Sequence, residues 1–256
     1  MTRSIKFLFA ALIAGMFLGA PVQAQDKAPK AADPPKAVEP EHKNGQPKAD
    51  GPKAEKKEEK AASEGDGSEY EYAKIATSKG DIYVRLNKTK APISTKNFLE
   101  YADKKFYDNT IFHRVVKEFV VQGGGFTTEL KEKETSAPIK NEWKNGLKNK
   151  KGTIAMARVA AADSATSQFY INVQDNEALD YPREAGDNAA YAVFGNVVAG
   201  MKVVDQIRQV RTTTKNGSRP DGKPIPLHDC PAENVVIKSI ARVSKDEAEK
   251  AAESDK

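Results

Sequence analysis

A short stretch of the chain combines side chains that can act on a peptide bond without covalent chemistry. Residues 112–116 (Phe-His-Arg-Val-Val) are followed by an apolar pair at 119–120, by Gln122, and by three glycines and a phenylalanine at 123–126. Arg114 carries several N–H donors on a guanidinium that keeps its charge, so it can polarise an amide without exchanging a proton. Gln122 can hold backbone groups of a bound chain. These residue types predict a site that binds and polarises an amide.

The alternation of residue types in this stretch predicts a β-strand. Arg114 and Val116 would share one face and His113 would lie on the other, because neighbouring side chains on a strand point to opposite sides of a sheet. The glycines that follow mark a tight bend or a close backbone approach. A purely structural interpretation, with a solvated arginine, an apolar core pair and a simple turn, stays open from these residues alone.

Other kinds of active site find little support in the sequence. His42, His113 and His228 lie far apart, and no pair of them has the spacing of metal ligands. Ser164 lacks the Gly-x-Ser-x-Gly context of a hydrolase nucleophile. The glycines at 123–125 lack the Lys-Ser/Thr pair that follows a phosphate-binding loop. We therefore expect neither a metal nor a cofactor, and we interpret His113 as a structural residue.

The segments around this stretch predict a hairpin and two helices that position it. Residues 72–77 and 81–86 alternate in polarity and are separated by Ser-Lys-Gly at 78–80, which is a hairpin signal. Pro92 suits the first turn of a helix, and apolar residues follow it at three-and-four spacing. The same spacing predicts a second amphipathic helix over residues 200–210.

Strands are expected to dominate the rest of the domain. Several short segments are rich in β-branched and aromatic residues, which with the hairpin makes about eight strands and two helices. Strands and helices do not alternate regularly, so a closed antiparallel barrel or a sandwich is favoured over a doubly wound sheet. The further strand segments are residues 112–122, 152–157, 168–173, 193–198 and 235–243.

Residues 1–24 have the form of a secretory signal peptide. Two basic residues, Arg3 and Lys6, precede an apolar stretch, and small residues stand before an expected cleavage after Ala24. The apolar stretch is shorter than the roughly 20 residues that span a bilayer, so a cleaved signal is favoured over a membrane anchor. We expect a mature protein outside the cytoplasm, with no stable membrane insertion after cleavage.

Composition divides the rest of the chain into three parts. Residues 25–69 are rich in Ala, Pro, Lys and Glu and predict a disordered charged linker. Residues 70–244 make one domain of ordinary size, and residues 245–256 make a polar tail that is either a frayed helix end or disorder. Cys230 is the only cysteine, so the core has to stabilise the domain without an intramolecular disulfide.

The charge pattern argues against nucleic acid as a partner. Lys and Arg number 41 against 36 Asp and Glu, which gives a net charge of +5. The basic residues are scattered among acids and do not form a stripe with interleaved aromatics. The linker has charges of both signs, as expected of a solvated tether, and a partner-binding role for it stays open.

Four motifs together resemble a known family. Residues 112–116 with 122–124, then 152–157 (Gly-Thr-Ile-Ala-Met-Ala), 167–171 (Ser-Gln-Phe-Tyr-Ile) and 193–195 (Val-Phe-Gly) are similar in order and spacing to the cyclophilin-type peptidyl-prolyl cis-trans isomerases. The resemblance covers about residues 72–243, and the runs 164–169 and 191–195 look most like the bacterial periplasmic branch.

The resemblance implies a mainly β fold: a closed eight-stranded antiparallel barrel capped by two α-helices, with the active groove on its outer face. It implies catalytic roles for Arg114 and Gln122. The substrate-binding residues that it implies are Phe119, Val120, Ala157, Arg158, Tyr170, Leu179 and Tyr191.

Some of these residues depart from the pattern that the family commonly shows. Val120, Arg158 and Tyr191 stand where other side chains are more frequent. Tyr170 stands where phenylalanine is common, so its hydroxyl needs a partner, and we expect a slightly more polar pocket. Ala178 stands where many members carry the tryptophan associated with tight cyclosporin binding, so weak binding of that drug is expected.

The activity that the resemblance implies is acceleration of X-Pro isomerisation during the folding of secreted or envelope proteins, in the periplasm. The substrates would be proline-containing unfolded or extended polypeptides, no cofactor would be needed, and a monomer is expected. Arg114 would donate to the prolyl nitrogen of the twisted amide. Two alternatives stay open: a peptide-binding module or chaperone that uses the same groove with catalysis incidental, and a tethered structural protein of the envelope.

Overall fold

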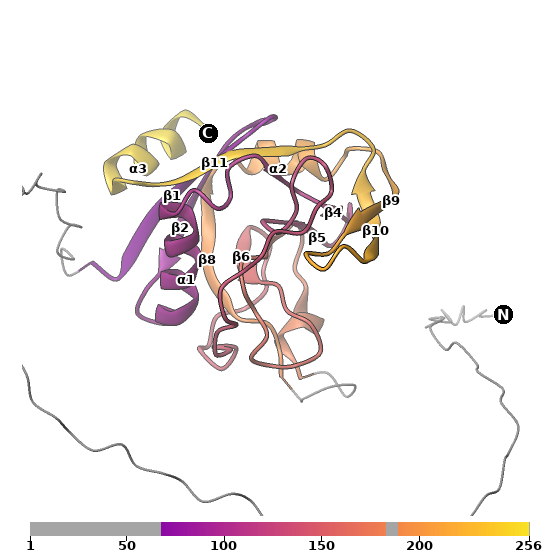
Figure 1. Cartoon of the computed structure of the whole chain (residues 1–256). Helices are drawn as coiled ribbons and strands as arrows, with labels where there is room; N and C mark the ends of the chain where they lie inside the picture. Colours follow the sequence, from indigo (N-terminus) through magenta and orange to yellow (C-terminus); the bar gives the residue numbers. More distant parts are fainter. Residues whose placement is uncertain (1–67, 183–188, 256) are drawn as a thin grey trace, which may run out of the picture. The chain divides into compact units, whose positions relative to one another are not determined.

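The computed structural model describes residues 68–182 and 189–255 (Figure 1). The predicted signal peptide, nearly all of the predicted linker and the middle of the loop at 181–190 lie outside the described residues. Among the helices of the described residues, none is both long and apolar enough to cross a bilayer.

The domain opens with the predicted hairpin, formed by β1 (Tyr70–Thr77) and β2 (Gly80–Asn87). The two strands pair antiparallel with Ile75 opposite Ile82, and alternate residues of both are buried. Gly80 has a φ of 132°, a backbone conformation that side-chain-bearing residues rarely adopt, which explains the glycine in the turn. The period-two pattern of the sequence therefore sets which face of the hairpin enters the core.

One curled antiparallel sheet of nine strands contains this hairpin. Its order is β3-β11-β1-β2-β8-β6-β7-β5-β4. A separate two-stranded hairpin is formed by β9 (Thr212–Ser218) and β10 (Pro224–Pro231). The remaining strands of the large sheet are β3 (Thr110–Ile111), β4 (Arg114–Val115), β5 (Val120–Gly123), β6 (Thr153–Met156), β7 (Phe169–Asn172), β8 (Val193–Ala199) and β11 (Val236–Val243).

The prediction of a closed eight-stranded barrel was wrong in its details. The sheet has nine strands, and its hydrogen-bonded ladder ends at β3 and β4. These two edge strands are consecutive in the chain and are joined only by Phe112 and His113, so the backbone itself connects the two ends of the sheet. The predicted strand at 112–122 is interrupted because a turn forms within it, in which the Phe119 N–H donates to the Val116 carbonyl at 3.0 Å.

Within residues 68–182 and 189–255, three α-helices accompany the sheet, one more than the sequence predicted. α1 (Pro92–Asp103) begins at the predicted proline and packs against β11, and α2 (Met201–Ile207) packs against β2. α3 (Lys245–Ser254) lies in the polar tail, and Figure 1 shows it at the end of the chain beyond β11. The Ser244 hydroxyl caps α3 by accepting from the Glu247 N–H at 3.1 Å, and Ala248 is buried beneath it.

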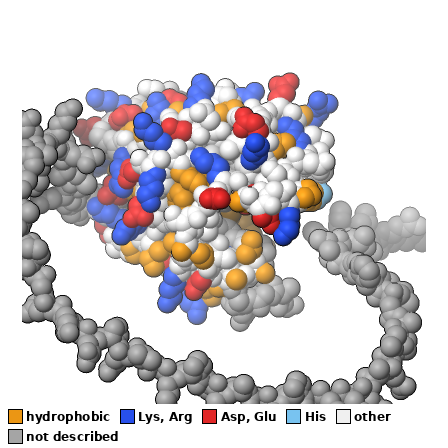
Figure 2. All heavy atoms as spheres, in the orientation of Figure 1, with side chains coloured by type: hydrophobic (Ala, Val, Ile, Leu, Met, Phe, Trp, Pro, Cys, Tyr) orange, Lys and Arg blue, Asp and Glu red, His pale blue; other side chains and the backbone are white. Residues whose placement is uncertain are grey.

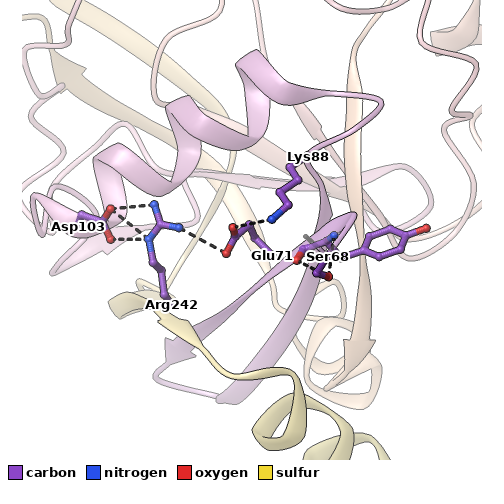
Figure 3. Close-up of polar contacts among 6 residues, drawn as sticks. Ser68, Glu71, Lys88, Asp103 and Arg242 are labelled. Atoms are coloured by element: carbon purple, nitrogen blue, oxygen red, sulfur yellow. Dashed lines mark hydrogen bonds and ion pairs between the residues drawn. The ribbon is translucent and has the colours of Figure 1, made fainter. Parts of the chain in front are cut away.

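Ion pairs on the surface tie α1 to the first and last strands (Figure 3). The Arg242 guanidinium of β11 lies 3.0 Å from Asp103, at the end of α1, and 3.6 Å from Glu71 of β1. Lys88, just after β2, lies 3.4 Å from Glu71. Such exposed pairs each contribute little to stability, so the buried core carries the fold. On the face shown in Figure 2, charges of both signs are interspersed, as the sequence suggested.

Two groups of buried side chains matter for the site. The main core contains an aromatic group, in which Phe98 packs against Tyr107, Phe169 and Phe194 at centroid distances of 5.3 to 5.4 Å. A smaller cluster consists of Val120, Ala155, Tyr170, Leu179 and Val193, with Phe119, Leu147, Ala157 and Tyr191 packed against it. This smaller cluster forms the floor and walls of the candidate site.

Candidate active site

All nine residues that the sequence assigned to a groove line one cavity of about 270 Å³. Three neighbouring strands place the central ones, because Arg114 of β4 pairs with Gln122 of β5 and Gln122 pairs with Tyr170 of β7. Ala157 follows β6, and Leu179 lies in a short 3-10 helix at Glu177–Asp180. With Tyr191, which precedes β8, the fold brings together residues from six separate segments of the chain.

Arg114 stands at the edge of the sheet with its side chain partly exposed. The centre of its guanidinium lies 5.7 Å from the centre of the Phe119 ring, within the range of a cation–π contact. Its Nε lies 3.8 Å from a carboxylate oxygen of Asp229. A permanently charged donor therefore lies beside an apolar ring, where it can polarise a bound amide.

Gln122 is held from the side by a second glutamine. Its Nε2 donates to Gln168 Oε1 at 3.0 Å, and this contact fixes the plane of the Gln122 amide. The Gln122 Oε1 can then accept an N–H from a bound chain. Gln168 was not among the predicted site residues, and it adjoins β7 just before Phe169.

The apolar part of the cavity is formed by Phe119, Val120, Leu179 and two tyrosines. Tyr170 and Tyr191 pack edge to face with ring centres 5.8 Å apart. The Tyr170 hydroxyl donates to Asn149 Oδ1 at 2.8 Å, and both residues are buried. The partner that this hydroxyl needs is therefore an amide of the protein.

Asn149 belongs to a buried polar network that sequence reasoning missed. Its Oδ1 also accepts from Asn172 Nδ2 at 3.1 Å, and its own Nδ2 donates to Asp180 Oδ1 at 2.9 Å. Asn176 Nδ2 then donates to Asn172 Oδ1 at 2.7 Å and to the Phe119 carbonyl at 2.8 Å. The network links the turn that carries Phe119 to the segment that carries Leu179. No local motif signals it, because its members lie on separate segments.

Arg158 lines the cavity but uses its guanidinium mainly on backbone carbonyls. It donates to Val159 and Ala160 at 3.0 and 3.1 Å, and to Ala190 at 3.2 Å. Its guanidinium also lies 5.0 Å from the ring centre of Tyr191. The geometry makes Arg158 a connector between two loops at the rim of the cavity, in addition to a residue that a substrate can touch.

A second cavity of about 310 Å³ continues the first, because Gln122, Ala157 and Arg158 line both. Its far wall includes Ile225 and Leu227 of β10. Two adjoining cavities of this size suit an extended chain that is longer than one residue. The sequence did not predict this extension, since β10 reaches it only through the fold.

His113 lines the second cavity and is 5% exposed. Burial lowers its pKa from 6.5 to about 4, and the charge of neighbouring Arg114 adds to this shift. The imidazole is therefore neutral near pH 7, and its ring packs on Phe126 with centres 4.7 Å apart. Among the described residues, no group of three or more His, Cys, Asp and Glu side chains could hold a metal ion.

Comparisons with known proteins agree on one family. The family model described as cyclophilin type peptidyl-prolyl cis-trans isomerase/CLD matches residues 72–242. A curated relative named peptidyl-prolyl cis-trans isomerase A, from Dickeya dadantii, is 47% identical over 171 residues, which are 67% of this chain and 84% of the relative. A peptidyl-prolyl cis-trans isomerase from Acinetobacter baylyi is 56% identical over 140 residues, which are 55% of this chain and 73% of the relative.

A similar solved structure shows the same fold. A cyclophilin type isomerase of Cryptosporidium parvum matches with a TM-score of 0.54 and 23% identity, covering 69% of this chain and 99% of that one. That protein has also been solved in the presence of the dipeptide Ala-Pro, with a TM-score of 0.53.

Proposed function

The chain belongs to the cyclophilin-type peptidyl-prolyl cis-trans isomerase family, and on this premise we propose that its groove accelerates X-Pro isomerisation in extended polypeptides by stabilising the twisted amide without covalent chemistry. The enzyme class follows from the family. The observation that supports this site and mechanism is the single cavity that gathers Arg114, Gln122 and an apolar floor.

The chemistry needs a donor in the twisted state. Amide resonance gives the X-Pro bond a rotational barrier of about 18–20 kcal/mol, so uncatalysed isomerisation takes tens of seconds or longer. In the twisted state the prolyl nitrogen loses its resonance and regains a lone pair. The Arg114 guanidinium can donate to that lone pair more strongly than to either planar form. Each 1.4 kcal/mol of this preference raises the rate about tenfold.

The other lining residues hold the substrate while the bond rotates. Phe119, Val120 and Leu179, with the Tyr170 ring, offer an apolar surface for a proline ring. Gln122 can hold a backbone group of the same chain, and the adjoining cavity can accept the residues next to it. Fixing the ring and the neighbouring backbone leaves only the carbonyl before proline free to turn.

The proposed substrates are proline-containing unfolded or extended polypeptides. The Ala-Pro dipeptide named with the Cryptosporidium structure supports this class. We further propose, from the signal-like sequence of residues 1–24 alone, that the clients are secreted or envelope proteins met in the periplasm. Ala178 is exposed next to Leu179, and a tryptophan there would add apolar contact, so weak cyclosporin binding remains part of the proposal. A monomer is proposed as the acting form.

Exchange NMR on a short Ala-Pro peptide tests the function without a coupling protease. The protein should broaden and merge the cis and trans signals, and Arg114→Ala should remove most of this acceleration. Arg219→Ala, which deletes an exposed arginine of the same domain, is the matched control and should keep the wild-type rate. No acceleration by folded wild-type protein would refute the function. Protection of an unfolding client that survives in Arg114→Ala would instead support the chaperone alternative.

A further inference from the structure

A carboxylate from the separate β9–β10 hairpin contacts Arg114. Asp229 Oδ2 lies 3.8 Å from Arg114 Nε, and the two side chains are 48% and 37% exposed. Figure 1 shows the hairpin beside β4 and β5, and β10 packs against β4. Asp229 is not among the residues that line the groove, so it approaches Arg114 from outside the cavity.

The backbone of β10 is shaped to present this side chain. Leu227 pairs with Lys215 of β9 and Cys230 pairs with Thr213, so two residues of β10 face one of β9 between them. This is the arrangement of a β-bulge, which commonly redirects a side chain beside a functional site. Asp229 has a φ of 55°, in the left-handed region where aspartate and asparagine are favoured over most residues.

The bulge is anchored on both sides. Leu227 and Cys230 are buried in one cluster with Ile111 and Phe126. Ile111 is the last residue of β3, so the hairpin is fixed to the segment that leads directly into β4. Asp229 and Arg114 are therefore carried by backbones that are packed against each other, which favours a defined geometry between their side chains.

We propose that Asp229 is a positioning residue for Arg114 in the isomerase reaction. This inference rests on the proposed donor role of Arg114. An ion pair through Nε leaves the two terminal nitrogens of the guanidinium for the bound amide. The Phe119 ring contacts the guanidinium as well, so the carboxylate and the ring together restrict its rotation. A restricted guanidinium loses less freedom when it meets the twisted amide.

The expected effect is moderate because the pair is exposed and longer than a direct hydrogen bond. Exposed ion pairs are worth at most about 1 kcal/mol in ground-state stability, which corresponds to about a fivefold change. Misplacement of a reacting group adds to that loss, so we expect kcat/KM to fall about three- to tenfold when the carboxylate is removed. The loss should lie in kcat, since Asp229 does not line the cavity that holds the peptide.

Two substitutions test the proposal while keeping the backbone. Asp229→Asn removes the charge in a similar shape, and Asp229→Gly removes the side chain at a φ that glycine adopts freely. Asp221→Asn is the matched control, because Asp221 is an exposed acid of the same hairpin that pairs with Lys223 at 2.9 Å. Peptide titrations followed by exchange NMR should give a three- to tenfold lower kcat for both Asp229 variants, with KM and the Asp221→Asn rate within twofold of wild type.

A second measurement follows the arginine directly and does not depend on turnover. ¹⁵N relaxation of the Arg114 Nε–H should show faster internal motion in both Asp229 variants than in wild type and in Asp221→Asn. Unchanged motion and unchanged kcat would overturn the proposal. So would a further fall in residual rate when Asp229→Asn is added to Arg114→Ala, because that result would show direct action on the substrate. If wild type gave no acceleration, the proposed function would fail, and the relaxation data alone would still decide whether Asp229 orders Arg114.

Discussion

Lowering the pH should destabilise the domain through one buried histidine. Burial, and then the charge of Arg114, lower the pKa of His113 to about 4 in the folded protein, against 6.5 for the free side chain. The unfolded chain therefore binds a proton at higher pH than the folded one does. The stability that neutral His113 contributes is fully present above pH 6.5, is lost as the pH drops towards 4, and changes no further below that. The loss from this residue should be about 2 kcal/mol at pH 5 and about 3 kcal/mol at pH 4.

Urea unfolding followed by far-UV circular dichroism measures this loss. The variants are His113→Leu, which can still pack on Phe126, and His228→Leu, which changes an exposed histidine and serves as the control. The free energy of unfolding of wild type minus that of His113→Leu should fall by about 2 kcal/mol from pH 7.5 to pH 5. The difference between wild type and His228→Leu should stay nearly constant.

The comparison removes the contributions of carboxylates, since these are common to all three proteins and cancel in the differences. A His113→Leu variant whose stability falls in parallel with that of wild type over this range would refute the reasoning. It would mean that the imidazole accepts a proton in the folded state, and hence that the site is wetter than its 5% exposure indicates.

Three further substitutions probe the support of the groove and the packing of the fold. Tyr170→Phe should cost about 1 kcal/mol in urea unfolding, because it deletes the bond to Asn149, and kcat/KM should stay within twofold; a large fall in rate would show that the hydroxyl acts on the substrate. Glu142→Ala should cost about 2 kcal/mol, because the carboxylate accepts from two backbone N–H groups at the start of α1; no change would contradict this capping role. Gly200→Ala should lower the melting temperature far more than Gly146→Ala. Both glycines have positive φ, but a Cβ at position 200 would lie 2.3 Å from a backbone oxygen of β2, whereas position 146 has open space. Equal effects would disprove the steric argument.

Local patterns predicted much of the fold. The alternation in residues 72–86 predicted the first hairpin, and Pro92 marked the start of α1, because both signals act within a few residues. For the polar tail at 245–256 the sequence could not decide between a frayed helix end and disorder, because the amphipathic pattern there is short. A single buried side chain, Ala248, and the Ser244 cap accompany the helix that forms there.

The groove residues could be chosen from the sequence because the family motifs contain them. The residues that hold them in place could not be chosen in this way. The Asn149 network joins loops that share no motif, and the second cavity depends on β10, which reaches it from far along the chain. The broken strand at 112–122 was missed because most of its residue types suit a strand, and only Lys117 and Glu118, at the turn, do not. The turn before β5 depends on backbone hydrogen bonds that composition does not reveal.

The position of Arg114 in the sheet leaves its side chain with little restraint from neighbouring residues in the chain. It lies on a strand of two residues at the edge of the sheet, paired on one side only, by β5. A short edge strand has few ladder hydrogen bonds to fix the direction of a long, flexible side chain. The other side of β4 is where the sheet fails to close, so the neighbour that a barrel strand would have there is replaced by the β9–β10 hairpin. The hairpin that packs at this seam carries Asp229, whose carboxylate lies 3.8 Å from Arg114 Nε and would supply the restraint that we propose for it.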